Sequence, residues 1–431
     1  MSVQIKRFFA GVLACTVLLS CGCTKQPEPA YAPLEITPAP ETVQLPPVES
    51  TPPSDAPRLE PPPAMNVCVV ECDGTVNLRS GASSHAELLE MLPAGSRVRV
   101  IEFEERYAYV EVLESGLQGY MIAGYLRPEE DVLGLEIVTV TDTYTYEQMR
   151  ADMLAFKEKY GDAVTLETAG VTACGVEIPV LVLGARSAPH HVFVQAAIHA
   201  REHMTALLVM ALSEAWLSAG ASEEVCFHVM PMANPDGVKI SQEAVYDDHT
   251  RAMYTNDFAA GQTQEEGEEY LRKWKANYNG VDINRNFDAL WEKVNSAPAP
   301  SAEGYRGSAP GSEPETQALI SYTQAYDFDA TISYHATGSM IYWQFGPATE
   351  ADKAAHALAE VIGELAGYSV EFDDGTSFGG YKDWASSKCG IPSLTIEIGT
   401  RSAPLPETDF YNIWVRNRFV FKAVAEWVKS A

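Results

Sequence analysis

The chain has 431 residues, of which 46% are hydrophobic, so it can form two or three folded units around a substantial core. Its 30 basic and 59 acidic residues give a net charge of −29. This balance argues against a nucleic-acid partner, because phosphates require a basic surface. The acidity fits a protein outside the cell, or reflects solubility alone.

Residues 1–20 have the pattern of an export signal. Basic residues precede an apolar stretch, residues 8–19, which is too short to span a bilayer. The stretch runs into Cys21 through a Leu-Leu-Ser sequence that resembles the processing site of bacterial lipoproteins, with Cys23 as a second candidate for lipidation. We expect an exported lipoprotein that faces the cell wall and is held in the membrane by its lipid anchor only. A secreted protein is the alternative.

Residues 21–65 are predicted to be a linker, because thirteen prolines fall between residues 24 and 64. Such a composition cannot pack a core and favours extended polyproline II. At ~3.1 Å per residue, this segment would be a semi-rigid spacer of up to ~120 Å.

Residues 66–130 are predicted to form a small β barrel, because short β-rich runs alternate with turns. The runs cover residues 67–70, 97–101, 107–112 and 119–122. Three stretches, residues 75–81, 92–98 and 119–126, resemble bacterial SH3-like domains. In exported bacterial proteins, such domains often hold cell-wall peptide. The resemblance therefore implies binding to the cell wall, with a spacer barrel that lacks a ligand as the alternative.

Residues 138–431 alternate between strand and helix patterns, which predicts an α/β domain with a mixed sheet between helices. Helices are expected over residues 146–160, 204–217, 315–326, 351–366 and 416–429. Buried strands are expected over residues 178–183, 192–198, 226–230, 330–334 and 394–398. The acidic residues 242–268 are expected to form an irregular surface loop near the site.

Metal-binding side chains lie at three of these strands. His199 and Glu202 follow the first, His335 follows the second, and Glu397 lies within the third. A buried ionised Glu is costly without a cation, a metal or a catalytic role. Two His and one carboxylate form a common catalytic zinc set that leaves a position for water. A second carboxylate can take the proton of that water and pass it to a leaving amine.

A further segment contains Arg285 between Asn284 and Asn286. Arg is the side chain best suited to grip a carboxylate with two hydrogen bonds. Near a metal site, it suggests a substrate with a free carboxylate next to the scissile bond.

With these motifs, residues 138–431 resemble the zinc metallocarboxypeptidases, the carboxypeptidase A-like family. The motifs occur in the family order: His199-Ala200-Arg201-Glu202, Asn234-Pro235-Asp236-Gly237, Val281-Asp282-Ile283-Asn284-Arg285-Asn286, His335 and Glu397. The resemblance implies these roles: one zinc ion on His199, Glu202 and His335, Glu397 as general base and acid, Asn284 and Arg285 on the terminal carboxylate, and Arg201 in substrate binding. It also implies that His203 is not a ligand, because the family uses one His on that turn.

The sequence departs from the family pattern at two positions. The mobile Tyr that caps the substrate corresponds to Gly375, and either Phe378 or Tyr381 could replace it. The Arg that stabilises the oxyanion has no clear counterpart, and either Arg272 or Lys275 could serve.

Lys382 precedes an Asp-Trp pair, at the position where the family sets its preference for the terminal side chain. A Lys there suggests a side chain with a carboxylate, and an exposed loop Lys is the alternative. Residues 274–277 and 334–343 also resemble bacterial members that cut γ-D-glutamyl-diaminopimelate in cell-wall peptides. Arg285 could then hold the near carboxylate of diaminopimelate and Lys382 the far one.

These features together predict a zinc peptidase of the cell envelope that cuts peptidoglycan stem peptides. A wall-binding barrel would raise the effective concentration of the substrate at the catalytic domain. A scavenging carboxypeptidase for ordinary peptides is one alternative. A non-catalytic wall-binding lipoprotein is the other.

Overall fold

The structure is a computed structural model that describes residues 67–430, except residues 73, 105, 130–132, 245 and 373–376. The expected export signal and linker lie outside the described residues. No helix within the described part of the chain is both long enough and apolar enough to cross a bilayer.

The first folded region is a seven-stranded antiparallel sheet with the order β3-β2-β6-β5-β4-β1-β7. Its strands are β1 (Val67–Val70), β2 (Thr75–Arg79), β3 (Leu88–Pro93), β4 (Arg97–Glu104), β5 (Tyr107–Val112), β6 (Gln118–Ile122) and β7 (Leu126–Pro128). Alternate residues face the interior, as in β2, where Val76 and Leu78 are buried whereas Thr75 and Asn77 are exposed. The expected small SH3-like β unit is confirmed.

The second region is built on an eight-stranded sheet with the order β14-β13-β15-β12-β10-β11-β9-β8. Its strands are β8 (Val164–Val171), β9 (Glu177–Leu183), β10 (His190–Ala196), β11 (Val225–Met230), β12 (Ala330–Ala336), β13 (Met340–Tyr342), β14 (Ser369–Glu371) and β15 (Ser393–Ile398). The four central strands β11, β10, β12 and β15 are parallel, whereas β9 and β13 join them antiparallel. Parallel strands covered on both faces read as continuous apolar runs, which explains why the central strands were recognisable from the sequence.

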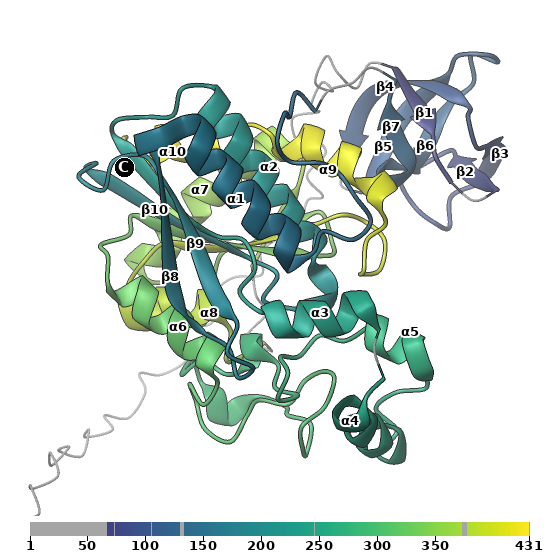
Figure 1. The fold of residues 1–431 in the computed structure, drawn as a ribbon. Coiled ribbons are helices and arrows are strands. Elements are labelled where there is room, and N and C mark those ends of the chain that lie inside the picture. Colours follow the sequence, from purple (N-terminus) through teal and green to yellow (C-terminus); the bar gives the residue numbers. More distant parts are fainter. Residues whose placement is uncertain are drawn as a thin grey trace, which may run out of the picture. The chain divides into compact units, whose positions relative to one another are not determined.

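Helices cover both faces of this sheet (Figure 1). They are α1 (Tyr146–Tyr160), α2 (Met204–Ser218), α3 (Pro235–Glu243), α4 (Asp248–Ala259), α5 (Gly267–Arg272), α6 (Pro314–Gln324), α7 (Glu350–Ala366), α8 (Tyr381–Trp384), α9 (Phe410–Asn417) and α10 (Val420–Val428). In β10, Val192 and Val194 pack into the core under α1, α2, α7 and α10, whereas Phe193 packs under α6 and α8. The expected α/β/α arrangement is confirmed.

Two expected elements were wrong. Residues 242–268 contain the helix α4 and the first two residues of α5 instead of an irregular loop. The helix α4 begins with a capping box, in which Asp247 and Thr250 each accept a hydrogen bond from the other's backbone N–H. Polar capping residues and acidic helix positions made this segment look like a loop. The expected helix over residues 416–429 is interrupted between α9 and α10.

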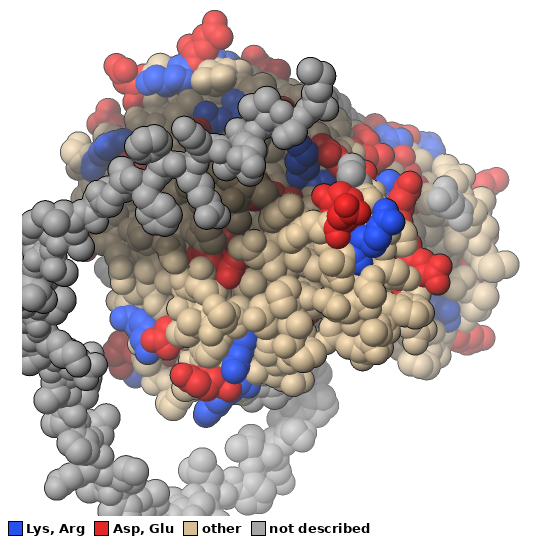
Figure 2. All heavy atoms as spheres, turned by 60° about the horizontal axis from the view of Figure 1, so that its bottom comes forward, with Lys and Arg blue, Asp and Glu red and all other residues tan. Residues whose placement is uncertain are grey.

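Charged side chains on the face shown in Figure 2 form small groups of mixed sign, separated by uncharged surface. Among the described residues, surface charges of opposite sign form pairs, such as Lys388 with Asp288 at 3.0 Å and Lys273 with Glu265 at 2.6 Å. The excess negative charge therefore does not form one continuous acidic surface on this face.

Candidate active site

The loop that follows β10 carries two of the predicted metal ligands. Ala197 adopts a φ of 48°, which turns the chain out of the sheet, and its N–H donates to Thr205 Oγ1 at 2.9 Å. A short 3-10 turn over Ala200–Glu202 then brings the carboxylate of Glu202 back to the imidazole of His199. Glu202 Oε1 lies 2.8 Å from His199 Nδ1.

The parallel neighbour β12 supplies the third predicted ligand. His335 Nδ1 lies 3.1 Å from His199 Nδ1 and 3.0 Å from Glu202 Oε2. All three side chains are buried. Burial alone raises the pKa of Glu202, but the attraction and hydrogen bonds of the two imidazoles outweigh it and lower the pKa, so Glu202 is ionised.

This donor set fits a metal ion better than direct hydrogen bonds. Two imidazole nitrogens 3.1 Å apart can share only one proton, and Glu202 offers acceptor oxygens alone. Nitrogen ligands at about 2.0–2.1 Å from a tetrahedral zinc ion lie roughly 3.3 Å from each other, close to the spacing seen here. His199, Glu202 and His335 would therefore hold one zinc ion and leave a position for substrate or water.

Asp282, for which the sequence predicted no role, lies behind this cluster. Its Oδ1 is 3.3 Å from His199 Nε2, and its Oδ2 is 3.5 Å from Lys275 Nζ. Burial raises the pKa of Asp282, but Lys275 and His199 outweigh this effect and hold the pKa well below its usual value. A carboxylate on the far nitrogen of a ligand imidazole fixes its tautomer and orientation. The available signal was a lone carboxylate between Val281 and Ile283.

Glu397 lies beside the metal-ligand cluster in the sheet. It is the register partner of His335 in the pairing of β12 with β15, and β13 flanks its other side at Met340. Burial raises the pKa of Glu397 to about 7, although the nearby His335 opposes the rise. A carboxyl group with a pKa near neutrality suits both the uptake and the release of a proton.

A cavity of about 670 Å³ opens over these groups. The site residues predicted from the sequence all line it, namely His199, Arg201, Glu202, Asn284, Arg285, His335, Lys382 and Glu397. These residues come from five separate parts of the chain, and the fold brings them to one place. Lys275 and Asp383 also line the cavity.

Lys275, and not Arg272, is the cation that faces the site. Lys275 Nζ lies 3.2 Å from Glu303 Oε1, and Arg201 Nη1 lies 3.0 Å from the other oxygen of the same carboxylate. Burial lowers the pKa of Lys275, but Asp282 and Glu303 outweigh this effect and raise the pKa, so the ammonium is charged. Arg272 lies on the exposed side of α5, 3.8 Å from Glu268.

Hydrogen bonds fix the residues predicted to hold the substrate carboxylate. Asn284 Oδ1 accepts from the Tyr381 N–H at 2.9 Å. Arg285 Nη1 donates to the Asn284 carbonyl at 2.8 Å, and Arg285 lines the cavity. Both residues therefore line the cavity that the metal-ligand cluster also lines.

Lys382 is only 6% exposed, so it is not an exposed loop residue. Its Nζ lies 2.7 Å from Asp383 Oδ1 and donates to the Gln344 carbonyl at 2.8 Å. An ammonium has three hydrogens, so one is left for a ligand in the cavity. The cavity therefore contains a Lys–Asp ion pair in addition to Arg285.

The two candidates for a capping aromatic do not occupy the cavity. Tyr381 is fully buried and its hydroxyl bonds to Thr323 Oγ1 at 2.9 Å, whereas Phe378 packs near Phe345. Gly375 lies outside the described residues. Phe372, for which the sequence predicted no role, lines the cavity and is 64% exposed.

His203 stays apart from the ligand cluster. It is buried just before α2, and burial lowers its pKa to about 4, so the imidazole is neutral. Its position agrees with the expectation that only one His of this turn is a ligand.

Comparisons with known proteins agree with this geometry. The zinc carboxypeptidase family model matches residues 149–419, and the bacterial SH3 domain model matches residues 74–127. Gamma-D-glutamyl-L-diamino acid endopeptidase 1 of Lysinibacillus sphaericus is 26% identical over 302 residues, which cover 67% of this chain and 73% of that protein. Carboxypeptidase B of Astacus astacus is 24% identical over 316 residues, covering 67% of this chain and 98% of that one.

The fold also matches solved carboxypeptidase structures. Carboxypeptidase A from Helicoverpa armigera superposes with a TM-score of 0.52 at 19% identity, over 69% of this chain and 75% of that chain. The family model covers more than half of the 431 residues and contains the whole metal-ligand cluster. The chain belongs to the zinc carboxypeptidase family, and it carries a bacterial SH3 domain ahead of its catalytic domain.

Proposed function

We propose that this zinc peptidase hydrolyses the bond between γ-D-glutamate and diaminopimelate in peptidoglycan stem peptides. The observation that carries the proposal is the Lys382–Asp383 ion pair in the same cavity as Arg285 and the metal-ligand cluster. The name of the Lysinibacillus sphaericus relative and the bacterial SH3 domain support the same class of substrate.

Diaminopimelate fits this cavity because both of its ends are amino acids. Arg285 and Asn284 would hold the carboxylate next to the scissile bond. At the far end, Lys382 would donate to the second carboxylate and Asp383 would accept from the second ammonium. A substrate with lysine in place of diaminopimelate has only an ammonium at this end. Lys382 would then have no substrate carboxylate to bind.

The residues of the chain divide the chemistry among them. Zinc held by His199, Glu202 and His335 lowers the pKa of water and polarises a carbonyl. Glu397 would take the proton of the attacking water and pass it to the leaving amine. The charged Lys275 lies where it can stabilise negative charge that develops on the carbonyl oxygen.

Digestion of purified muropeptides tests the proposal. The wild type should cut diaminopimelate peptides faster than otherwise identical lysine peptides, with products identified by mass spectrometry. The variant Lys382→Ala should lose most of this preference, whereas Lys388→Ala, which removes an exposed Lys paired with Asp288, should keep it. An unchanged preference in Lys382→Ala would refute the assignment of Lys382.

The alternative functions predict different results. A scavenging carboxypeptidase would release C-terminal residues from ordinary peptides and ignore muropeptides. A non-catalytic wall-binding protein would bind no zinc and release nothing. The wild type digested beside Glu397→Gln separates these cases, because only the proposed activity yields diaminopimelate fragments that disappear in the variant.

For its location, we propose an exported lipoprotein that faces the cell wall, with the SH3 domain bound to peptidoglycan. The lipoprotein-like sequence around Cys21 and the proline-rich segment support this placement. Metabolic labelling with a fatty acid should mark the wild type and not Cys21→Ala, and a label that persists in the variant would point to Cys23 instead.

A further inference from the structure

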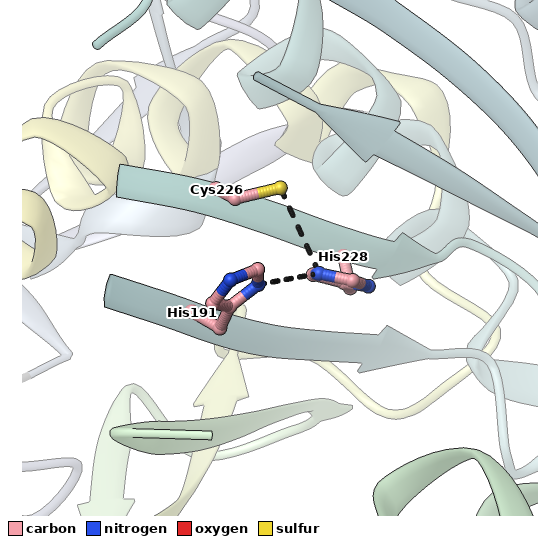
Figure 3. Close-up of side chains that lie close together, drawn as sticks. All are labelled: His191, Cys226 and His228. Carbon is pink, nitrogen blue, oxygen red and sulfur yellow. Dashed lines mark hydrogen bonds between the residues drawn. The ribbon is translucent and has the colours of Figure 1, made fainter. Parts of the chain in front are cut away.

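A second cluster of metal-binding side chains lies at the opposite end of the sheet from the active site. His191 stands at the start of β10, and Cys226 and His228 stand on the adjacent parallel strand β11. Figure 3 shows the three side chains pointing toward one another. His191 precedes the end of β10 by five residues, which is about 16 Å along a strand, so this cluster is separate from the catalytic one.

The strand register explains why these residues meet. His191 and Cys226 are register partners in the pairing of β10 with β11. Alternate residues of a strand point to the same face, so His228 lies on the same side as Cys226. All three therefore face the layer that contains α6, whose Tyr322 contacts His228.

The distances among the donor atoms fit a metal ion. His191 Nδ1 lies 2.9 Å from His228 Nε2, and Cys226 Sγ lies 3.6 Å from the same nitrogen. The three donor atoms all lie within 4.8 Å of one another. For tetrahedral zinc, nitrogen and sulfur ligands at about 2.0–2.1 and 2.3 Å lie roughly 3.6 Å apart, and two nitrogens roughly 3.3 Å.

A chain of hydrogen bonds orients His228 for this role. Its Nδ1 lies 2.8 Å from the Tyr322 hydroxyl, which in turn donates to Glu167 Oε2 at 2.8 Å. The hydroxyl therefore accepts from Nδ1–H, and Nε2 is left with its lone pair facing His191 and Cys226. Ligand imidazoles commonly have such a partner on their second nitrogen.

The surroundings allow an ion to enter. Cys226 and His228 are buried, but His191 is only partly buried and so connects the cluster to solvent. The thiol of Cys226 would lose its proton to solvent when a metal binds.

We propose that His191, Cys226 and His228 form a second metal site for a thiophilic ion such as Zn²⁺, which ties β10 to β11 at their N-terminal ends. One Cys and two His suit zinc or copper better than magnesium or calcium, which prefer oxygen ligands. The site uses none of the residues assigned to hydrolysis.

Cobalt titration of the metal-free full-length protein tests this site. Only a thiolate ligand gives Co²⁺ an intense near-ultraviolet charge-transfer band, and the cluster of His199, Glu202 and His335 contains no sulfur. The wild type should bind two Co²⁺ per chain and develop this band. One Co²⁺ per chain without the band would overturn the proposal and leave His191 and His228 as a hydrogen-bonded pair.

Single-residue variants test which side chains give rise to the charge-transfer band. Cys226→Ser should abolish the band and bind one Co²⁺, with peptide hydrolysis retained. His191→Ala should weaken the second binding event at least about tenfold. Cys174→Ser, which changes an exposed Cys, should keep the band. A band that persists in Cys226→Ser would contradict the site.

Discussion

Replacement of Asp282 by Asn tests how the site holds its metal. Asn keeps the size of the side chain and places an oxygen near His199 Nε2, as Asp282 does at 3.3 Å, but it removes the negative charge. Partners behind a ligand imidazole contribute about 10–100-fold to metal affinity. We therefore expect zinc to bind Asp282→Asn 10–100-fold more weakly, which is about 1.4–2.7 kcal/mol.

The same change also affects Lys275. The ammonium lies 3.5 Å from Asp282 and retains only Glu303 as a charged partner in the variant. At an effective dielectric constant of about 20, a pair at this distance attracts by roughly 5 kcal/mol. Because Glu303 remains, the free energy of unfolding of the metal-free protein should fall by about 3 kcal/mol, at the lower end of the range for broken buried pairs.

Two measurements separate these effects. Competition with a chelator of known affinity gives the zinc dissociation constant, and denaturant unfolding of the metal-free protein gives the stability. Asp288→Asn is the matched control, because Asp288 is exposed and pairs with Lys388 at the surface, so it should change neither quantity by more than about 1 kcal/mol. If Asp282→Asn binds zinc as tightly as the wild type, the role assigned to Asp282 is wrong.

Three further predictions concern single side chains. Glu397→Gln should lower kcat by about 10²–10⁴-fold with zinc content unchanged, and a loss of zinc would instead indicate a structural role. Lys275→Met should lower kcat by about 10²–10³-fold, whereas Arg272→Met on the exposed side of α5 should leave it unchanged in the same steady-state assay. Burial raises the pKa of Glu315 from 4.5 to about 7, so the folded state binds its proton more tightly than the unfolded state does. Stability should therefore fall as pH rises from about 4.5 to 7, by roughly 3 kcal/mol, and Glu315→Gln should remove this fall in denaturant titrations.

The sequence alone was sufficient to identify the family and to predict which residues would line one site. Apolar runs marked the central parallel strands because both faces of those strands are covered by helices. His199 with Glu202, His335 and Glu397 each lie at or within such a run, so strand patterns and residue types together pointed to one zinc site. Buried His and Glu side chains are costly unless they bind a metal, transfer a proton or have a polar partner, so these residue types were informative.

Only the tertiary structure decided between residues of similar chemistry. Arg272 and Lys275 are three positions apart and both cationic, but one lies on the exposed side of α5 and the other faces the cavity. The role of Asp282 likewise depends on a distance to His199, and a distance across the fold is not encoded by local pattern.

The cluster of His191, Cys226 and His228 also depends on the tertiary structure. His191 and His228 are 37 residues apart in the chain, and no local motif links them. The register of β10 against β11 places these imidazoles 2.9 Å apart. Local sequence determines which segments become strands, because period and side-chain type act over a few residues. Which strands become neighbours, and in which register, is set by packing across the whole domain, so the contacts that create a site appear only in the folded chain.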